Sequence, residues 1–88
     1  MIPSPGRIVL VNISDEPGFP VLRPAIIVRV WDEYCVNARI LLDGGNDDRH
    51  RVALGLSADH PDWLTSISRA NAGDGSIGFR QCACPPRV

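Results

Sequence analysis

Residues that interrupt regular structure divide this chain into short segments. Gly, Pro, Asn and Asp gather at residues 14–20, 43–48 and 71–75. The stretches between them are short and rich in Val, Ile and Leu, and no long amphipathic helix pattern appears. Short apolar runs separated by turn-forming residues are typical of β-strands joined by tight loops. The sequence therefore predicts a mostly β fold.

Two neighbouring apolar segments predict a β-hairpin. In residues 24–31 one face is uniformly apolar, with Ile26, Val28 and Val30. In residues 35–42 one face carries Val36, Ala38, Ile40 and Leu42. Side chains two positions apart in a strand point the same way, so we expect both faces to enter the core. The polar residues 32–34 then form the turn.

Further strands are expected at residues 7–13, 51–56, 64–68 and 76–82. The segment 43–48 predicts a turn, because Gly and Asn tolerate positive φ and Asp side chains bond nearby amides. Residues 57–63 are equally compatible with a short helical turn that begins at Ser57 or Asp59. The segment 71–75 predicts another tight turn.

Five or six short strands in one small chain must cover their edges. Closure into a barrel removes unpaired edges, so we predict a single small antiparallel barrel, SH3-like, with an OB-like barrel as the alternative. We expect one domain over residues 1–88, with an extended N-terminal arm at 1–6 and a C-terminal tail at 83–88. A chain of 88 residues has a thin core, which burial against a partner would supplement.

Charge and hydropathy narrow the expected partners. The net charge is −1, so no sequence-wide attraction draws the chain to nucleic acid or to anionic lipid. No apolar run approaches the roughly 18 to 20 residues of a membrane span. We therefore expect neither a nucleic-acid nor a membrane partner.

Two histidines in acidic surroundings raise the question of a metal site. His50 and His60 are accompanied by Asp47, Asp48, Asp59 and Asp62. Their spacing matches no standard metal motif, and we interpret them as polar loop residues. The segment 43–48 resembles a calcium loop only in composition, because it lacks the alternating oxygen ligands and the distal Glu.

The cysteines offer a second, weak metal hypothesis. Cys82 and Cys84 lie on the same side of a predicted extended segment and could supply half of a zinc or copper site. The other half would have to come from Cys35 or a histidine. Free thiols are the simpler interpretation, and we expect no metal and no other cofactor.

Catalytic patterns are not recognisable in the sequence. No serine lies in a nucleophile-elbow pattern, and Glu16 and Glu33 lie in predicted loops without an evident acid–base partner. We therefore expect a protein that acts by binding and is not an enzyme.

A candidate recognition surface lies near one end of the predicted hairpin. Its residues are Arg29, Trp31, Tyr34 and Arg39. Planar cations and aromatic rings together are common at binding surfaces. The plainer interpretation is an exposed Arg and a half-buried Trp of an ordinary surface.

Several segments in a fixed order resemble a known family. They are Gly6-Arg-Ile-Val-Leu10, Arg23-Pro-Ala-Ile-Ile-Val-Arg-Val-Trp31, Cys35-Val-Asn37, Asp43-Gly-Gly-Asn-Asp47, Thr65-Ser66 and Pro85-Pro-Arg-Val88. Together they resemble a widespread family of short, mostly uncharacterised tailed-bacteriophage proteins, over nearly the whole chain. Members usually carry an aromatic-x-aromatic-Pro segment before the closing Pro-Arg-Val, where this chain has Cys82-Ala-Cys84-Pro85. A binding surface formed by those aromatics would be lost or altered here.

The resemblance implies a phage origin and leaves two functional hypotheses. The first is a virion accessory, such as a capsid decoration or stabilising protein, that binds the major capsid protein or itself. The second is a host-interaction or anti-defence protein in the host cytoplasm, which binds a host protein or a small anionic nucleotide signal through Arg29, Trp31 and Arg39. A single-strand nucleic-acid binder of OB type is a weaker third, disfavoured by the near-neutral charge.

Overall fold

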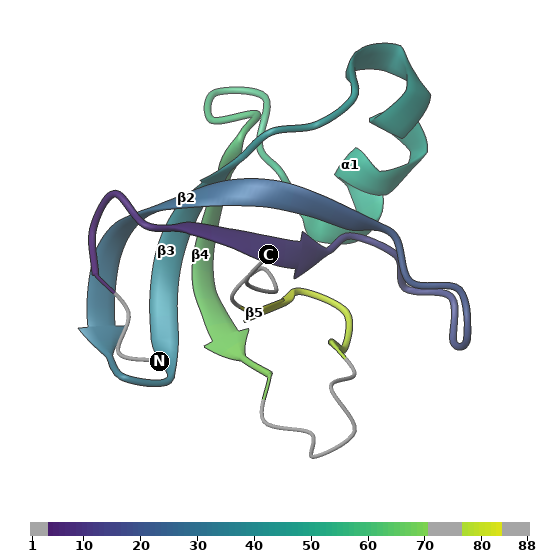
Figure 1. The fold of residues 1–88 in the computed structure, drawn as a ribbon. Helices are drawn as coiled ribbons and strands as arrows, with labels where there is room; N and C mark the ends of the chain where they lie inside the picture. The colour runs from purple at the N-terminus through teal and green to yellow at the C-terminus, as the bar shows by residue number, and fades with distance from the viewer. Residues whose placement is uncertain (1–3, 71–76, 84–88) are drawn as a thin grey trace.

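The computed structural model describes residues 4–70 and 77–83. Within them lie β1 (Ile8–Asn12), β2 (Leu22–Asp32), β3 (Cys35–Ile40), the 3-10 helix η1 (Gly44–Asp47), α1 (Asp48–Leu54), β4 (Trp63–Arg69) and β5 (Gln81–Ala83). Each strand pairs with the next in the chain, and β5 returns to β1, so the sheet closes into a barrel (Figure 1).

The predicted small β-barrel is confirmed. Its strands follow the chain in order around the barrel, as in an SH3-like fold, whereas an OB-like barrel has Greek-key connections. One pairing differs from the antiparallel prediction, because β4 and β5 run parallel while the other neighbours are antiparallel. A parallel pair requires a crossover of about a dozen residues, and the segment 70–80 between these strands has that length.

Apolar side chains from all five described strands and from α1 fill the barrel. The buried set is Val9, Val11, Ile13, Ala25, Ile27, Val36, Ala38, Ile40, Leu54, Leu64, Ile67 and Cys82. The face predicted for β3 is confirmed, since Val36, Ala38 and Ile40 all lie inside.

The face predicted for β2 is wrong from Ala25 to Val28. Ala25 and Ile27 are buried, whereas Val28 is 44% exposed. The register against β3 shifts between Ile27 and Arg29, so a β-bulge places an extra residue outside the ladder. After the bulge Val30 again packs against the core. The alternation of buried and exposed side chains therefore does not continue uniformly through the bulge.

The strand predicted at residues 51–56 is also wrong, because this segment belongs largely to α1. His50 and Leu54, four residues apart, are the buried residues of the helix, and Gly55 ends it in the left-handed conformation with φ 72°. The predicted turn at 43–48 contains η1 and leads directly into α1.

A charged pair joins this helical segment to β2. The guanidinium of Arg23 donates to both carboxylate oxygens of Asp47, at 2.8 and 3.0 Å. The amide of Asp43 donates to the same carboxylate at 2.6 Å. The pKa of Asp47 lies below its ordinary value, and the largest cause is the hydrogen bond from Arg23. Asp47 thus fixes η1 and the start of α1 against the barrel.

The ends of the chain differ in part from the prediction. Residues 4–6 of the predicted extended arm form a turn, in which the amide of Arg7 donates to Ser4 O at 3.2 Å and Gly6 has φ 87°. Ala83 belongs to β5 and not to a free tail, and the last strand is shorter than predicted. The rest of the predicted arm and tail, and the predicted turn at 71–75, lie outside the described residues.

Candidate binding surface

Trp31, near the end of β2, is exposed and yet held in place. Its Nε1–H donates to Asn37 Oδ1 at 2.9 Å. The guanidinium carbon of Arg29 lies 3.9 Å from the centre of the indole ring, within cation–π range. The residue nevertheless stays 52% exposed. One edge and one face of the ring are therefore fixed, while a large part of it remains open to a partner.

Asn37 on β3 connects Trp31 with residues of β4. Its Oδ1 also accepts hydrogen bonds from Thr65 Oγ1 at 3.0 Å and from the amide of Ser66 at 2.9 Å. Ser66 has φ 56°, a left-handed conformation that is unfavourable for a residue other than Gly. Asn37 is only 6% exposed and links three strands through one oxygen. We call Val28, Arg29, Trp31, Asn37 and Thr65 the Trp31 face.

The other two predicted residues form pairs of their own. Tyr34, in the β2–β3 turn, lies under the guanidinium of Arg69, whose central carbon is 4.7 Å from the ring centre. Arg39 forms an ion pair with Asp62, with Nη1 and Oδ2 separated by 3.0 Å. The structure thus brings Arg29 and Trp31 together, and it pairs Tyr34 and Arg39 with residues of other segments.

Arg39 borders a small recess at the start of β4. The recess has a volume of about 210 Å³ and is lined by Arg39, His60, Asp62 and Trp63. His60 and Trp63 meet edge to face, with ring centres 5.9 Å apart. Because the Arg39 and Asp62 charges already neutralise each other, this recess presents no free charge to an anionic ligand.

The chemistry of the Trp31 face favours contact with protein. The Trp31 face and the adjacent turn expose apolar area, with Val28 44%, Trp31 52% and Tyr34 52% exposed, although Phe19 and Val52 are more exposed elsewhere, at 66% and 87%. Trp, Tyr and Arg are the residue types that dominate the energetics of protein interfaces. The four predicted arginine and aromatic side chains do not converge on one anion.

Sequence reasoning missed the residues that organise this surface. Asn37 alternates with the apolar residues Val36 and Ala38 in the predicted strand, and because Asn is depleted in strands its presence in this segment was a usable signal. No comparable signal indicated that Thr65 and Ser66 would bond to Asn37 or that Arg69 would lie over Tyr34. They depend on the register between β3 and β4, which shifts between Val36 and Ala38.

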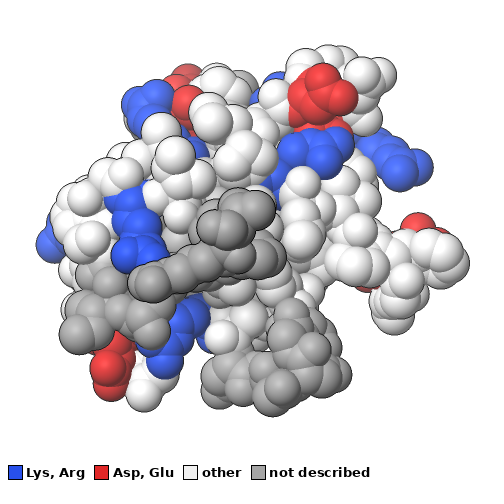
Figure 2. Space-filling model, in the orientation of Figure 1, with Lys and Arg blue, Asp and Glu red and all other residues white. Residues whose placement is uncertain are grey.

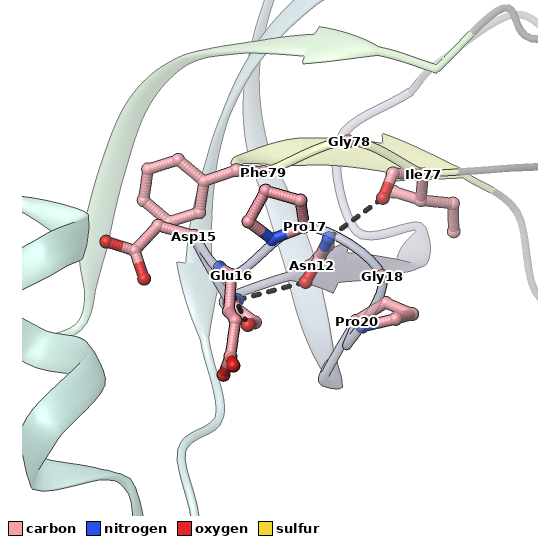
Figure 3. Close-up of a pocket in the computed structure, with 10 residues that line it drawn as sticks. Asn12, Asp15, Glu16, Pro17, Gly18, Pro20, Ile77, Gly78 and Phe79 are labelled. Carbon is pink, nitrogen blue, oxygen red and sulfur yellow. Dashed lines mark hydrogen bonds between the residues drawn. The ribbon is translucent and has the colours of Figure 1, made fainter.

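A second recess lies beside the β1–β2 loop (Figure 3). It measures about 490 Å³ and lies between the β1–β2 loop and residues 77–79. Asn12 forms part of its wall, donating to Ile77 O at 2.9 Å and accepting from Ser14 N at 2.9 Å. In Figure 3 the carboxylates of Asp15 and Glu16 point away from Asn12. Asn12 therefore acts as a brace for the loop.

The metal hypotheses gain no support from the described residues. Over 4–70 and 77–83, no group of three His, Cys, Asp or Glu side chains is placed to hold a metal ion. Cys82 is buried in the core, and burial raises the pKa of its thiol. Cys84 lies outside the described residues. His50 is buried on α1, and His60 is exposed beside Trp63.

No helix among the described residues is long and apolar enough to cross a membrane. Comparison of the chain with protein-family models, with curated proteins and with solved structures finds no match.

Proposed function

We propose that this protein is a non-enzymatic binding module that docks on another protein through the Trp31 face. The observation that carries the proposal is the fixed and exposed indole of Trp31, bonded to Asn37 at its edge and covered by Arg29 on one face. A side chain that is already ordered loses little conformational entropy on binding. An exposed aromatic residue of this kind suits the centre of a protein interface.

The role that agrees with this chemistry is that of an accessory subunit on a larger protein assembly. The resemblance to tailed-phage proteins supports a virion location, with the major capsid protein or a second copy of this chain as the partner at the Trp31 face. The thin core of an 88-residue chain supports the same proposal, because burial at an interface adds apolar burial that the chain alone cannot supply.

The alternative, a host-interaction protein that sequesters a small anionic signal, receives less support. Arg39 is paired with Asp62, and the guanidinium of Arg29 lies against Trp31. The face shown in Figure 2 carries small, separate groups of basic and acidic side chains with wide uncharged areas between them. Anion recognition would be better served by arginines that converge.

The virion role is tested by quantitative mass spectrometry of purified particles of the phage that encodes this chain, scaled to the major capsid protein. A stoichiometric amount in the particle supports the proposal. Complete absence from the particle contradicts the virion role and moves attention to a host partner.

We expect Trp31→Ala to weaken binding by about 10- to 100-fold, because it removes an aromatic residue that dominates the energy of the interface. Binding is measured between the purified variant and phage particles that do not contain this protein. The matched control is Val52→Ala, which truncates a side chain that is 87% exposed on α1 and distant in sequence from the Trp31 face. Co-sedimentation with the particles measures both variants. Equal affinity of Trp31→Ala and the unmodified protein would contradict the proposed surface.

A further inference from the structure

The loop between β1 and β2 carries a second exposed aromatic side chain. Phe19 is 66% exposed, more than any aromatic residue of the Trp31 face. The segment Glu16-Pro17-Gly18-Phe19 forms a type II turn, in which the amide of Phe19 donates to Glu16 O at 3.2 Å and Gly18 has φ 82°. Proline precedes the turn glycine, as this turn type favours. We call residues 14–20 the Phe19 loop.

The Phe19 loop is braced from within. Asn12 Oδ1 accepts hydrogen bonds from the amides of Ser14 and Val21, at 2.9 and 3.1 Å, on the two sides of the loop. Ser14 Oγ accepts from the amide of Glu16 at 3.2 Å. These bonds order the backbone that presents Phe19, so binding through this residue has a small entropic cost.

The Phe19 loop and the Trp31 face have complementary charge. Asp15 and Glu16 are exposed, and neither carboxylate forms an ion pair with a described residue. Arg29 likewise forms no ion pair with a described residue, and its guanidinium lies on Trp31. The loop thus offers an aromatic side chain beside two carboxylates, with Arg49 lining the recess that Asp15, Glu16 and Phe19 also line. The face offers an aromatic side chain covered by a guanidinium, with the exposed Asp32 and Glu33 following it in the chain.

These two surfaces lie at opposite ends of β2. The loop leads into the strand at Leu22, and Trp31 precedes its last residue, Asp32. Figure 1 shows the loop projecting from one side of the barrel and the β2–β3 turn at the other side. They therefore cannot meet within one chain, but they can meet between two copies.

We infer that the Phe19 loop of one copy docks on the Trp31 face of a second copy, which gives head-to-tail assembly. This inference rests on the proposed function, since it names the partner of the same face. A head-to-tail contact is heterologous, so it closes into a ring or continues as a chain. The net charge of −1 offers little repulsion between copies.

The contact is expected to be weak in solution. One loop docked on one face buries well below the roughly 800 Å² per partner of a stable interface. We expect a dissociation constant on the order of 100 µM. When neighbouring copies are held on a common lattice, the high effective concentration makes such a contact sufficient to join them.

Sedimentation velocity of the purified full chain, from about 10 µM to about 1 mM, tests the inference. The unmodified protein should shift to larger species as concentration rises. Glu16→Arg, Arg29→Glu and Phe19→Ala should each weaken association at least about fivefold. The controls Asp59→Arg and Leu41→Ala change exposed residues outside both surfaces and should associate normally.

Mixing two variants gives the decisive result. Glu16→Arg and Arg29→Glu should associate with each other, because the new arginine of the loop meets the new glutamate of the face and the two unchanged surfaces also match. A monomeric protein at every concentration, or a mixture no larger than its components, overturns the inference. If Trp31→Ala still loses particle binding in that case, the proposed function stands and only self-association is refuted.

Discussion

Replacing Asp47 with Ala is expected to lower the free energy of unfolding by about 2 to 4 kcal/mol, because one partner of a mostly buried ion pair is removed. The Asp47 carboxylate is 2% exposed and the Arg23 side chain is 28% exposed. Water can therefore replace only part of the hydrogen bonding that the Arg23 guanidinium loses. The amide of Asp43 also loses its acceptor. The helical segment η1–α1 then loses its charged attachment to β2.

The neighbouring Asp48 provides a matched control. Asp48 pairs with Arg51 at 3.1 Å, but its side chain is 69% exposed. Asp48→Ala is therefore expected to change stability by at most about 0.5 kcal/mol. Urea unfolding followed by circular dichroism measures both variants. Equal losses for the two substitutions would show that the buried pair has no special importance.

Acidification should remove the contribution of Asp47. Its pKa is lowered in the folded state, mainly by the hydrogen bond from Arg23. A lowered pKa stabilises the fold at pH values above the unfolded-state pKa, for which the ordinary value is 3.8, and this stabilisation is lost as the pH falls through the folded-state pKa. The stability difference between the unmodified protein and Asp47→Asn should therefore stay constant from about pH 7 to 5 and shrink below about pH 4. A difference that grows with acid would contradict this assignment.

The barrel could be predicted because local signals agree with the tertiary structure over most strands. In β3 the alternation of Val36, Ala38 and Ile40 is uninterrupted, and all three are buried. In β2 the bulge after Ile27 changes which face is buried, and nothing in the residues around Val28 marks its position. Periodicity predicts a strand more reliably than it predicts the face.

The helix α1 was missed because its residues also alternate. Val52, Leu54 and Leu56 are spaced as on one face of a strand, yet Val52 is 87% exposed and Leu54 is 1% exposed. One tertiary contact, the pairing of Asp47 with Arg23, and one local feature, the left-handed Gly55 that ends the helix, favour the helix. Gly55 was the sequence signal for a helix end.

The candidate surface was only partly predictable for a related reason. Arg29 and Trp31 are two apart on one strand, so their proximity follows from the sequence. The partners of Tyr34 and Arg39 come from β4 and from the loop before it. Their positions depend on bulges and strand register, which single-sequence patterns do not reveal.

Asn37→Ala is expected to destabilise the protein by about 1 to 3 kcal/mol, because three part-buried hydrogen bonds to one oxygen are lost. The side chains of Trp31 and Thr65 are exposed, so they can donate their hydrogen bonds to water in place of Asn37. The amide of Ser66 is held in a left-handed conformation and has less freedom to do so. Urea unfolding gives the loss of stability, and in a Trp63→Phe background the emission of Trp31 alone should shift to the red as its ring becomes mobile.

Asn37→Asp separates the hydrogen-bond role from simple loss of packing. The aspartate keeps an oxygen acceptor for Trp31 and Ser66, so Trp31 emission should stay near that of the unmodified protein, whereas the stability also carries the cost of burying a carboxylate at this position. Because Asn37 is only 6% exposed, we expect Asn37→Ala to change particle binding through the position of Trp31 and not through direct contact with the partner. The double variant with Trp31→Ala should then bind no worse than Trp31→Ala alone, a non-additivity that measures their coupling. Fully additive losses would mean that Asn37 does not position the indole.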